Sequence, residues 1–343
     1  RQRQMCIRDR KKIYQNIKST LIDKKNLTVR VKNWFDFSDL NEYILHWKVT
    51  GDDGTVLAEG NKEVACEPHA TVELTLGAVQ LPKTIREAYL DLGWTRKKST
   101  PLVDTAWEIA YDQFVLPASG KVWNGKPSEA GKTTFEVDEN TGALKSLCLD
   151  GEELLASPVT ISLFRPATDN DNRDRMGAKL WRKAGLHTLT QKVVSLKESK
   201  TSATAQVNIL NVTGKKVGDA TLEYTLNHNG SLKVQTTFQP DTTWVKSIAR
   251  LGLTFEMNDT YGNVTYLGRG EHETYIDRNQ SGKIGIYTTT PEKMFHYYVI
   301  PQSTGNRTDV RWVKLADDSG KGCWIESDSP FQFSALPFSD LLL

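Results

Sequence analysis

The segment Leu163-Phe164-Arg165-Pro166-Ala167-Thr168-Asp169-Asn170-Asp171-Asn172-Arg173-Asp174-Arg175-Met176-Gly177 separates a buried apolar run from a second series of predicted strands. Pro166 ends the apolar run, because proline lacks the N–H that a strand needs. The eight positions 168–175 then hold five charged side chains and three amides or hydroxyls. Asp and Asn accept left-handed backbone angles and bond their own main chain, so a well-capped loop is one interpretation. A solvated turn rarely needs so many polar groups, and a functional loop is the other interpretation.

Residues 13–117 carry an alternating pattern of short strands. Leu27, Val29 and Val31 fall on one face of a strand. Gly51-Asp52-Asp53-Gly54 predicts a hairpin turn. Strands are predicted over 44–49, 56–58, 67–76, 88–94 and 107–116. Short strands at this spacing over ~100 residues are typical of an immunoglobulin-like β-sandwich.

A second β domain is predicted over residues 132–343. The preceding residues, 118–131, are rich in proline, serine, glycine and lysine, which indicates a linker. Two strands flank Asp138-Glu139-Asn140-Thr141-Gly142, whose glycine suits a positive φ, and predict a hairpin. Beyond a short helix over 178–184, strands are predicted over 189–196, 204–210, 220–226, 231–238 and 248–255. The fold class is therefore all-β, with long antiparallel sheets in the second domain.

Composition and charge narrow the classes of function. The net charge of +2 is misleading, because residues 1–12 hold six basic residues and one acidic residue, so the remaining chain sums to −3. No basic surface for nucleic acid is indicated, and no apolar run reaches membrane-spanning length. Residues 1–10 show no periodicity and resemble a translated sequencing adaptor. We therefore treat residues 1–12 as a non-native or disordered leader that is not a signal peptide.

The sequence offers no pattern of metal or nucleotide chemistry. Cys6, Cys66, Cys148 and Cys323 stand far apart without a C-x-x-C motif and are predicted to be free thiols. The six histidines show no metal-ligand spacing. There is no H-E-x-x-H, no phosphate-binding glycine loop and no G-x-S-x-G.

A second polar segment spans residues 266–278. If it is extended, Glu271 and Glu273 point to one face with carboxyl groups ~7 Å apart, a separation that admits an acid and base pair for glycoside hydrolysis. The alternative, which we favour, is that Arg269 and Arg278 neutralise these carboxylates in a structural network.

Several motifs resemble the large β-galactosidases of glycoside hydrolase family 2. Arg-Pro-x-Thr-Asp-Asn-Asp at 165–171 is similar to the segment that opens their last domain, and Gly-Arg-Gly-x-x-Glu-x-Tyr-x-Asp-Arg at 268–278 is similar to a hallmark of that domain. Further matching segments, in the family's order, are 14–17, 33–40, 107–114, 298–312 and 331–335. The resemblance covers nearly everything from Ile13 to Phe338.

The resemblance implies a fold and a function. Residues 13–117 are expected to be a spacer, and residues 132–343 an antiparallel β-supersandwich of the galactose-mutarotase type, incomplete at its C-terminal end. The family's acid/base and nucleophile glutamates belong to a barrel, so no catalytic residue is expected here and activity of this chain alone is left open. The chain would be the non-catalytic C-terminal portion of an enzyme that hydrolyses terminal non-reducing β-D-galactose residues in β-galactosides with retention.

Site residues and partners follow from the same resemblance. In the family the loop after the first motif borders the galactose pocket, which implies substrate binding by Asp169, Asn170, Asp171 and Arg173. Many members place Arg-Gly or Ile-Gly where this chain has Asn172-Arg173-Asp174, so Gly177 is the nearest hinge candidate. No cofactor is expected in this chain, whereas related enzymes often use Mg²⁺ and Na⁺ bound by the barrel. The full enzyme is expected to be a homo-oligomer without nucleic-acid or membrane partners, and the sequence does not distinguish a location in the bacterial cytoplasm from one in the periplasm.

Two other classes of function stay open. One is a free-standing carbohydrate-binding module, because related supersandwiches in sugar epimerases bind sugars. Such a module requires exposed aromatic platforms, so solvent exposure discriminates it from a packed core at Trp123, Trp181, Trp244 and Trp312. The other, an adhesin of tandem β domains, predicts further sandwich repeats, and the sequence shows none.

Overall fold

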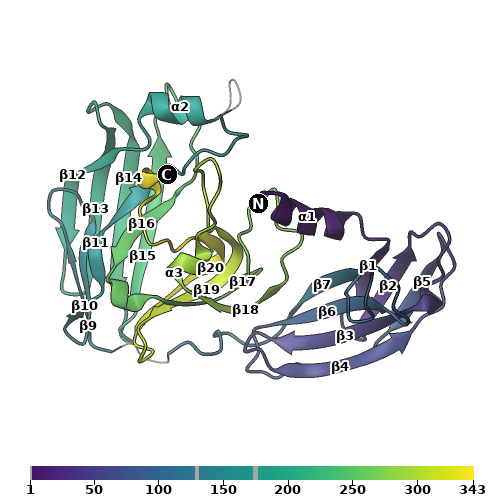
Figure 1. The fold of residues 1–343 in the computed structure, drawn as a ribbon. Helices are drawn as coiled ribbons and strands as arrows, with labels where there is room; N and C mark the ends of the chain where they lie inside the picture. Colours follow the sequence, from purple (N-terminus) through teal and green to yellow (C-terminus); the bar gives the residue numbers. More distant parts are fainter. Residues whose placement is uncertain (1, 128–130, 173–176) are drawn as a thin grey trace.

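Antiparallel sheets make up most of the regular structure of the computed structural model, which describes residues 2–127, 131–172 and 177–343. Within these residues five sheets form two units that lie side by side (Figure 1). The predicted all-β fold class is therefore confirmed.

The first unit is a sandwich of two sheets with the orders β1-β2-β5 and β4-β3-β6-β7. In β2, Val29 and Val31 are fully buried whereas Arg30 between them is exposed, which is the period-2 pattern of a strand with one face in a core. The same core contains Leu45 and Trp94. The elements are β1 (Ile17–Asp23), β2 (Thr28–Asn33), η1 (Leu40–Glu42), β3 (Tyr43–Gly51), β4 (Val56–Glu63), β5 (Thr71–Thr75), β6 (Glu87–Arg96) and β7 (Ala110–Pro117).

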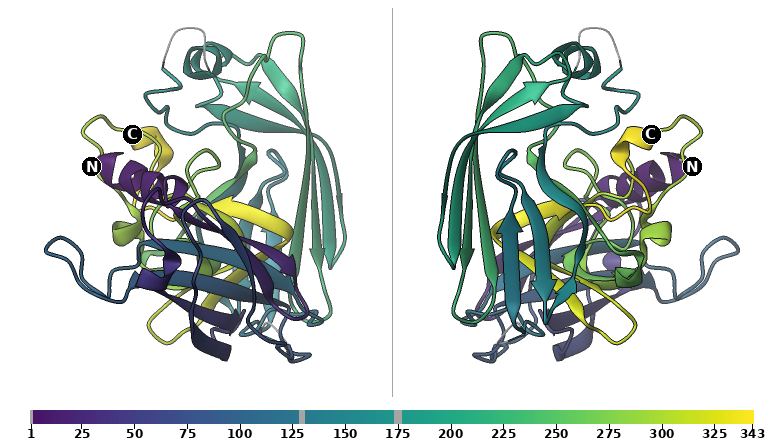
Figure 2. Two further views of the ribbon diagram at one scale, coloured as in Figure 1. Left: turned by 90° about the vertical axis from the view of Figure 1, so that its right-hand side faces the viewer. Right: turned by 90° about the vertical axis from the view of Figure 1, so that its left-hand side faces the viewer.

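The second unit is built from three sheets. Two of them, β12-β13-β14-β15 and the sheet of β10-β9-β11-β16 with β8, enclose one apolar core together with helix α2. Figure 2 shows the sheet β12-β13-β14-β15 on the outside of this unit, with α2 at one end. The elements are β8 (Thr133–Val137), β9 (Leu144–Leu149), β10 (Glu152–Glu153), β11 (Leu155–Ser162), α2 (Gly177–Ala184), β12 (Leu189–Glu198), β13 (Ser202–Asn211), β14 (Lys216–Leu226), β15 (Leu232–Pro240) and β16 (Gly252–Met257).

The third sheet of this unit, β18-β17-β19-β20, lies toward the sandwich (Figure 1). It has its own small core around Tyr266 and Val310. Its opposite side packs on the sandwich through Tyr89 of β6 and Trp312 of β19. The remaining elements are η2 (Asp259–Tyr261), β17 (Asn263–Arg269), β18 (Ile284–Thr289), α3 (Pro291–Met294), β19 (Arg307–Ala316), β20 (Gly322–Phe333) and η3 (Asp340–Leu342).

The predicted hairpin of β8 and β9 is present, and its turn requires glycine. Gly142 has a φ of 69°, and a Cβ added there would lie 2.8 Å from both Ala205 Cβ and Val207 Cγ1 of β13. The Tyr224 hydroxyl donates to the Gly142 carbonyl at 3.0 Å. The turn therefore packs directly on the neighbouring sheet, and glycine serves both the backbone angle and the close approach.

The segment predicted as a leader forms helix α1 (Gln2–Ile13). The last turn of α1 carries Arg10, Lys11 and Lys12. Lys11 donates to the Glu108 carbonyl, and Lys12 pairs with the Asp112 carboxylate. Basic side chains at a helix C-terminus are favourable, and here they find acceptors at the start of β7. These residues are therefore helical, in contrast to the predicted disordered leader. The helix could not be predicted from the local sequence, because its partners Glu108 and Asp112 are distant in the chain.

The predicted linker is packed rather than solvated over residues 118–127. Trp123 is only 5% exposed and joins the apolar cluster between the two units. Asn124 donates to the buried Asp52 carboxylate at 2.6 Å. The linker is therefore part of the contact between the units.

Candidate functional site

One carboxylate holds the loop between β11 and α2. The Arg165 guanidinium donates to both oxygens of Asp171, with Nη1–Oδ2 at 2.6 Å and Nη2–Oδ1 at 3.1 Å. The backbone N–H and hydroxyl of Thr168 donate to Oδ2 at 2.8 and 2.7 Å. Burial alone would raise the pKa of Asp171, but the bonds from Arg165 and Thr168 outweigh burial and lower it. We call Arg165, Thr168 and Asp171 the Arg165 clamp.

The two residues between Thr168 and Asp171 in the sequence lie on the surface. Asp169 and Asn170 are exposed, whereas Asp171 is half-buried in the clamp. Arg173, the fourth residue predicted to bind substrate, lies outside the described residues. The structure therefore separates the predicted set into two surface residues and one inward-facing residue. Substrate binding at this loop stays a prediction, and Asp169 and Asn170 are its accessible candidates.

Helix α2 supports the clamp through an aromatic ring. Trp181 is 4% exposed, and its indole nitrogen donates to Ser247 Oγ at 3.1 Å. The Arg165 guanidinium carbon lies 5.2 Å from the ring centroid, within cation–π range. A Cβ added to Gly177 would lie 2.2 Å from the same ring. Gly177 is thus needed for close packing, and a hinge role for it stays a prediction.

A second loop, after β17, is organised by Glu273. The segment 271–283 is not a strand, because Gly270 turns the chain with a φ of 75°. Glu273 is 6% exposed. Its carboxylate accepts from the Tyr298 hydroxyl, from Arg278 Nη2 at 3.1 Å, from Thr304 Oγ1 at 3.3 Å and from the Gly305 N–H at 2.9 Å. Burial and the charge of Glu273 raise the pKa of Tyr298. We call Glu273, Arg278, Tyr298, Thr304 and Gly305 the Glu273 cluster.

Glu271 and Glu273 do not form the pair that an extended strand would give. The Glu271 side chain is 66% exposed and contacts His272 Nε2 at 2.8 Å. The predicted structural network is confirmed for Arg278, which pairs with Glu273. It is wrong for Arg269, which pairs with Asp309 at 2.5 Å. The catalytic pair, which was the alternative we did not favour, is absent because the turn at Gly270 places the two glutamates in different surroundings.

The charge of Arg165 acts on Tyr275, a residue of the second loop. Burial first, and then the charge of Glu273, raise the pKa of Tyr275, while the positive charge of Arg165 acts in the opposite direction. Arg165 is therefore close enough to Tyr275 to influence its ionisation. The Tyr275 hydroxyl also donates to Ser303 Oγ at 3.2 Å.

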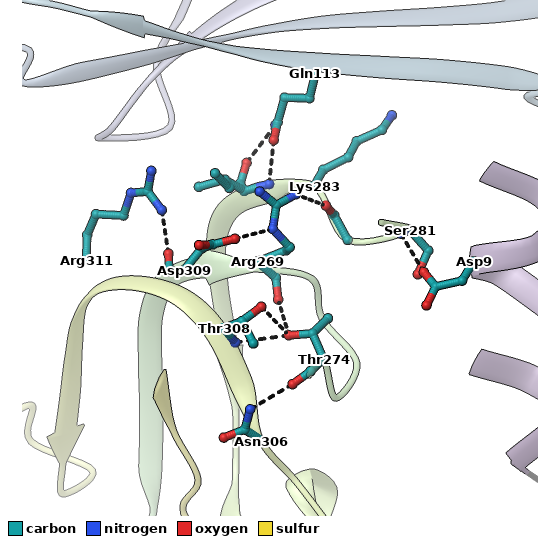
Figure 3. Close-up of polar contacts among 12 residues, drawn as sticks. Asp9, Gln113, Arg269, Thr274, Ser281, Lys283, Asn306, Thr308, Asp309 and Arg311 are labelled. Carbon is teal, nitrogen blue, oxygen red and sulfur yellow. Dashed lines mark hydrogen bonds and ion pairs between the residues drawn. The ribbon is translucent and has the colours of Figure 1, made fainter. Parts of the chain in front are cut away.

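The sandwich holds the far end of the second loop, as Figure 3 shows. The Gln113 amide of β7 donates to the Ile284 carbonyl at 2.9 Å and accepts from the Ile284 N–H at 2.6 Å, in the manner of a paired strand. Glu108 pairs with Lys283 at 3.0 Å. On β19, Arg311 is 7% exposed and pairs with Glu87 of β6 at 2.9 Å. The contact between the two units therefore reaches the base of the Glu273 cluster.

The tryptophans that would serve a sugar-binding module are largely covered. Trp123, Trp181 and Trp312 are each 5% exposed or less. Trp244 is half-buried, and Lys215 Nζ lies 3.9 Å from the centroid of its ring. Three of these rings are buried and a lysine lies over the fourth, which argues against the module that depends on them.

The described residues hold no group of three or more His, Cys, Asp or Glu side chains placed to bind a metal ion. Cys66, Cys148 and Cys323 are free thiols, as predicted, and the side chain of Cys6 lies outside the described part. No helix in the described part of the chain is long and apolar enough to span a membrane.

Sequence reasoning found Arg278 as a partner of Glu273 but not the other three. Tyr298, Thr304 and Gly305 lie 25 to 32 residues from it in sequence. No local pattern marks such partners, and only the polar run 301–309 near the start of β19 hints at buried hydrogen bonding.

Comparison with known proteins gives a consistent picture. Residues 29–117 match the family model "Beta-galactosidase, domain 4", and residues 129–343 match the model "Beta galactosidase small chain". The chain is 29% identical to a β-galactosidase of Priestia megaterium (strain DSM 319 / IMG 1521) over 353 residues, which cover 96% of this chain and 33% of that protein. It is 23% identical to a β-galactosidase of Actinobacillus pleuropneumoniae, with the same two coverages.

The chain thus spans about a third of the length of these relatives. The small-chain model alone covers residues 129–343, which is more than half of the chain. Domain 4 corresponds to the sandwich and the small chain to the three sheets that follow. This chain therefore belongs to the β-galactosidase family, as the C-terminal part that joins domain 4 to the small chain.

Proposed function

We propose that this chain is the non-catalytic portion of an enzyme that hydrolyses terminal non-reducing β-D-galactose residues in β-galactosides with retention. Membership of the β-galactosidase family and the names of its relatives support the substrate class. The reaction would be carried out by the full-length protein, because this chain matches only 33% of each of those relatives.

The surroundings of Glu271 and Glu273 support a non-catalytic role. A retaining glycosidase needs two carboxyl groups ~5–5.5 Å apart that both reach the sugar. Glu273 is buried, and four donors occupy its carboxylate. Glu271 is exposed and contacts His272. The pair that the sequence suggested is therefore unsuited to the chemistry.

We further propose that the loop of residues 165–177 borders the active site of the full-length protein. The observation that carries this proposal is the Arg165 clamp, which presents Asp169 and Asn170 to solvent from a fixed loop. A binding group placed by a rigid neighbour loses little conformational freedom when substrate arrives. Asp171 then acts as a positioning residue rather than as a substrate contact.

The sandwich would set the position of the second unit relative to the rest of the enzyme. Its buried contacts with β17–β19, through Tyr89, Glu87 and Gln113, support this role. The resemblance further supports a homo-oligomeric full-length enzyme, whose Mg²⁺ and Na⁺ ions would be held by its barrel. Light scattering of the full-length protein tests the oligomeric state.

Kinetics of the full-length protein test the loop. Asp169→Ala and Asn170→Ala are each expected to raise KM or lower kcat for a nitrophenyl β-galactoside by ~10-fold or more, because sugar contacts or geometry are lost. Lys233→Ala, an exposed residue of β15, is the matched surface control. Equal kinetics for all three variants would show that the loop is only a turn. The 343-residue chain alone is expected to be inactive, and turnover that depends on Glu271 would overturn the non-catalytic assignment.

A further inference from the structure

A cavity opens beside Arg307, the first residue of β19. It lies between the turn after β17 and the segment around α3, and its polar lining includes Glu271, His272, Glu273, Lys293, His296 and Arg307. Its volume of about 120 Å³ holds several water molecules or one small oxyanion. We call this cavity the Arg307 pocket.

Arg307 is a buried cation with neutral partners. It is 2% exposed. Its Nε donates to the Tyr266 hydroxyl at 2.8 Å, Nη1 to the carbonyls of Gly305 and Asn306 at 3.0 and 3.2 Å, and Nη2 to the Glu271 carbonyl at 3.0 Å. Within the described residues it forms no ion pair, and one of its five N–H groups is left over. A buried charge of this kind is costly unless an opposite charge accompanies it.

The two carboxylates that line the pocket are engaged elsewhere. Glu273 is neutralised by Arg278. Glu271 faces solvent, where it contacts His272 at 2.8 Å and Arg8 at 3.6 Å. Within the described residues neither glutamate pairs with Arg307, so its guanidinium has no direct counterion.

Two further groups at the pocket can donate to an anion. The Nε2 atom of His296 is buried and has no hydrogen-bond partner in the described structure. Lys293, at the end of α3, is exposed at the rim and forms no ion pair with a described residue. Burial, and then the charge of Arg8, lower the pKa of His272, with a smaller contribution from Arg307.

We propose that the Arg307 pocket binds one small oxyanion, a carboxylate or phosphate group, through Arg307, Lys293 and His296 Nε2. The anion would supply the missing counterion of Arg307 and the missing partner of His296. The oxyanion has two possible sources. It is either a free anion or an acidic side chain from the part of the full-length protein outside this chain. The binding does not depend on galactosidase activity, so either proposal can fail alone.

Titration of the 343-residue chain with inorganic phosphate, at constant ionic strength, tests the site. We expect saturable shifts of the ring nitrogen signals of His272 and His296 in NMR spectra and a rise in Tm. Lys293→Gln should weaken phosphate binding about tenfold, because one charge-assisted hydrogen bond is lost. Lys233→Gln removes the same charge from β15 and should leave the affinity unchanged. Arg307→Lys keeps the charge but loses the planar fork, and should also bind more weakly.

The outcomes separate the sources and decide the proposal. Phosphate binding by both the chain and the full-length protein would identify a free anion. Binding by the chain that is lost in the full-length protein would identify an internal acidic side chain. No saturable response in the chain, or equal affinities for Lys293→Gln and Lys233→Gln, would overturn the site. Because Lys293 lies at the rim, its variant keeps the test valid even if Arg307→Lys fails to fold.

Discussion

Asp171 and Glu273 both hold a loop with a carboxylate, but their partners lie at different distances along the chain. Within the described residues, the side chain of Asp171 accepts from Arg165 and Thr168, which are six and three residues away. Glu273 accepts from Arg278, which is five residues away, and from groups 25 to 32 residues away. The Arg165 clamp therefore shapes one loop, whereas the Glu273 cluster joins separate segments. The second arrangement should matter more for stability, and the first more for presenting the residues it leaves exposed.

The largest expected effect is on Glu273. Glu273→Ala removes the shared acceptor of the cluster and leaves Arg278 and the Tyr298 hydroxyl without their partner. We expect the free energy of unfolding to fall by about 3–5 kcal/mol, as for other broken buried pairs. Urea unfolding of the 343-residue chain measures this. Glu271→Ala is the control and should change stability by less than about 0.5 kcal/mol, because its side chain is 66% exposed. Equal losses of stability for Glu273→Ala and Glu271→Ala would show that the buried hydrogen bonds of Glu273 do not stabilise the fold.

A smaller loss of stability is expected when the Arg165 clamp is broken. Arg165→Ala removes two charge-assisted bonds from Asp171, and we expect a loss of about 1–3 kcal/mol in the same unfolding experiment. A double-mutant cycle with Asp171→Ala should show strong coupling, because each variant breaks the same bonds. Additive losses would mean that Arg165 acts mainly through its packing on Trp181.

Gln113→Ala should affect one loop and not the other. The amide makes two hydrogen bonds to the Ile284 backbone, so we expect a loss of about 1–2 kcal/mol and faster hydrogen exchange at Ile284. Exchange in residues 165–172 should be unchanged, because the sandwich does not contact the Arg165 clamp through this residue. Gln235→Ala, on the exposed face of β15, is the control. Loosening of both loops would show that they form a single cooperative unit.

The smallest expected effect is on how the free energy of unfolding depends on pH in acid. The folded-state pKa of Asp171 is lowered, so its contribution to stability is fully present above the unfolded pKa of about 3.9. That contribution is lost as the pH falls through the lower folded-state pKa. Asp171→Asn should therefore flatten the dependence of unfolding free energy on pH below about 4. Parallel curves for the two proteins would contradict the ionised clamp.

Local chemistry explains what could be predicted from the sequence. The strands that became β12–β16 follow from alternating apolar residues, and the hairpin before them follows from the turn ending at Gly142. The sequence located the polar loop at 165–171. It did not predict that Asp171 points inward, because this depends on the direction in which the Arg165 side chain points. The extended arrangement of Glu271 and Glu273, which we considered but did not favour, is absent because Gly270 turns the chain with a positive φ.

Long-range contacts explain what could not be predicted. Trp123 lies in a stretch whose composition is typical of a linker, yet it packs between Tyr89 and the third sheet of the second unit. The partners of Glu273 other than Arg278, and the partner of Arg269, are likewise set by how distant segments pack together and not by their spacing in the sequence. The sequence pattern therefore located the two polar loops better than it predicted their hydrogen bonds.

Gly142 bears on which substitutions the family can accept. Any other residue there would need the positive φ and would also collide with Ala205 and Val207 on the facing strand. Gly151 and Gly214 also have positive φ, but nothing lies within 4 Å of an added Cβ at either position. Asn or Asp can occupy such open left-handed positions at little cost. In homologous sequences the two open positions should therefore drift to Asn or Asp, while the position of Gly142 should resist replacement over the same evolutionary distance.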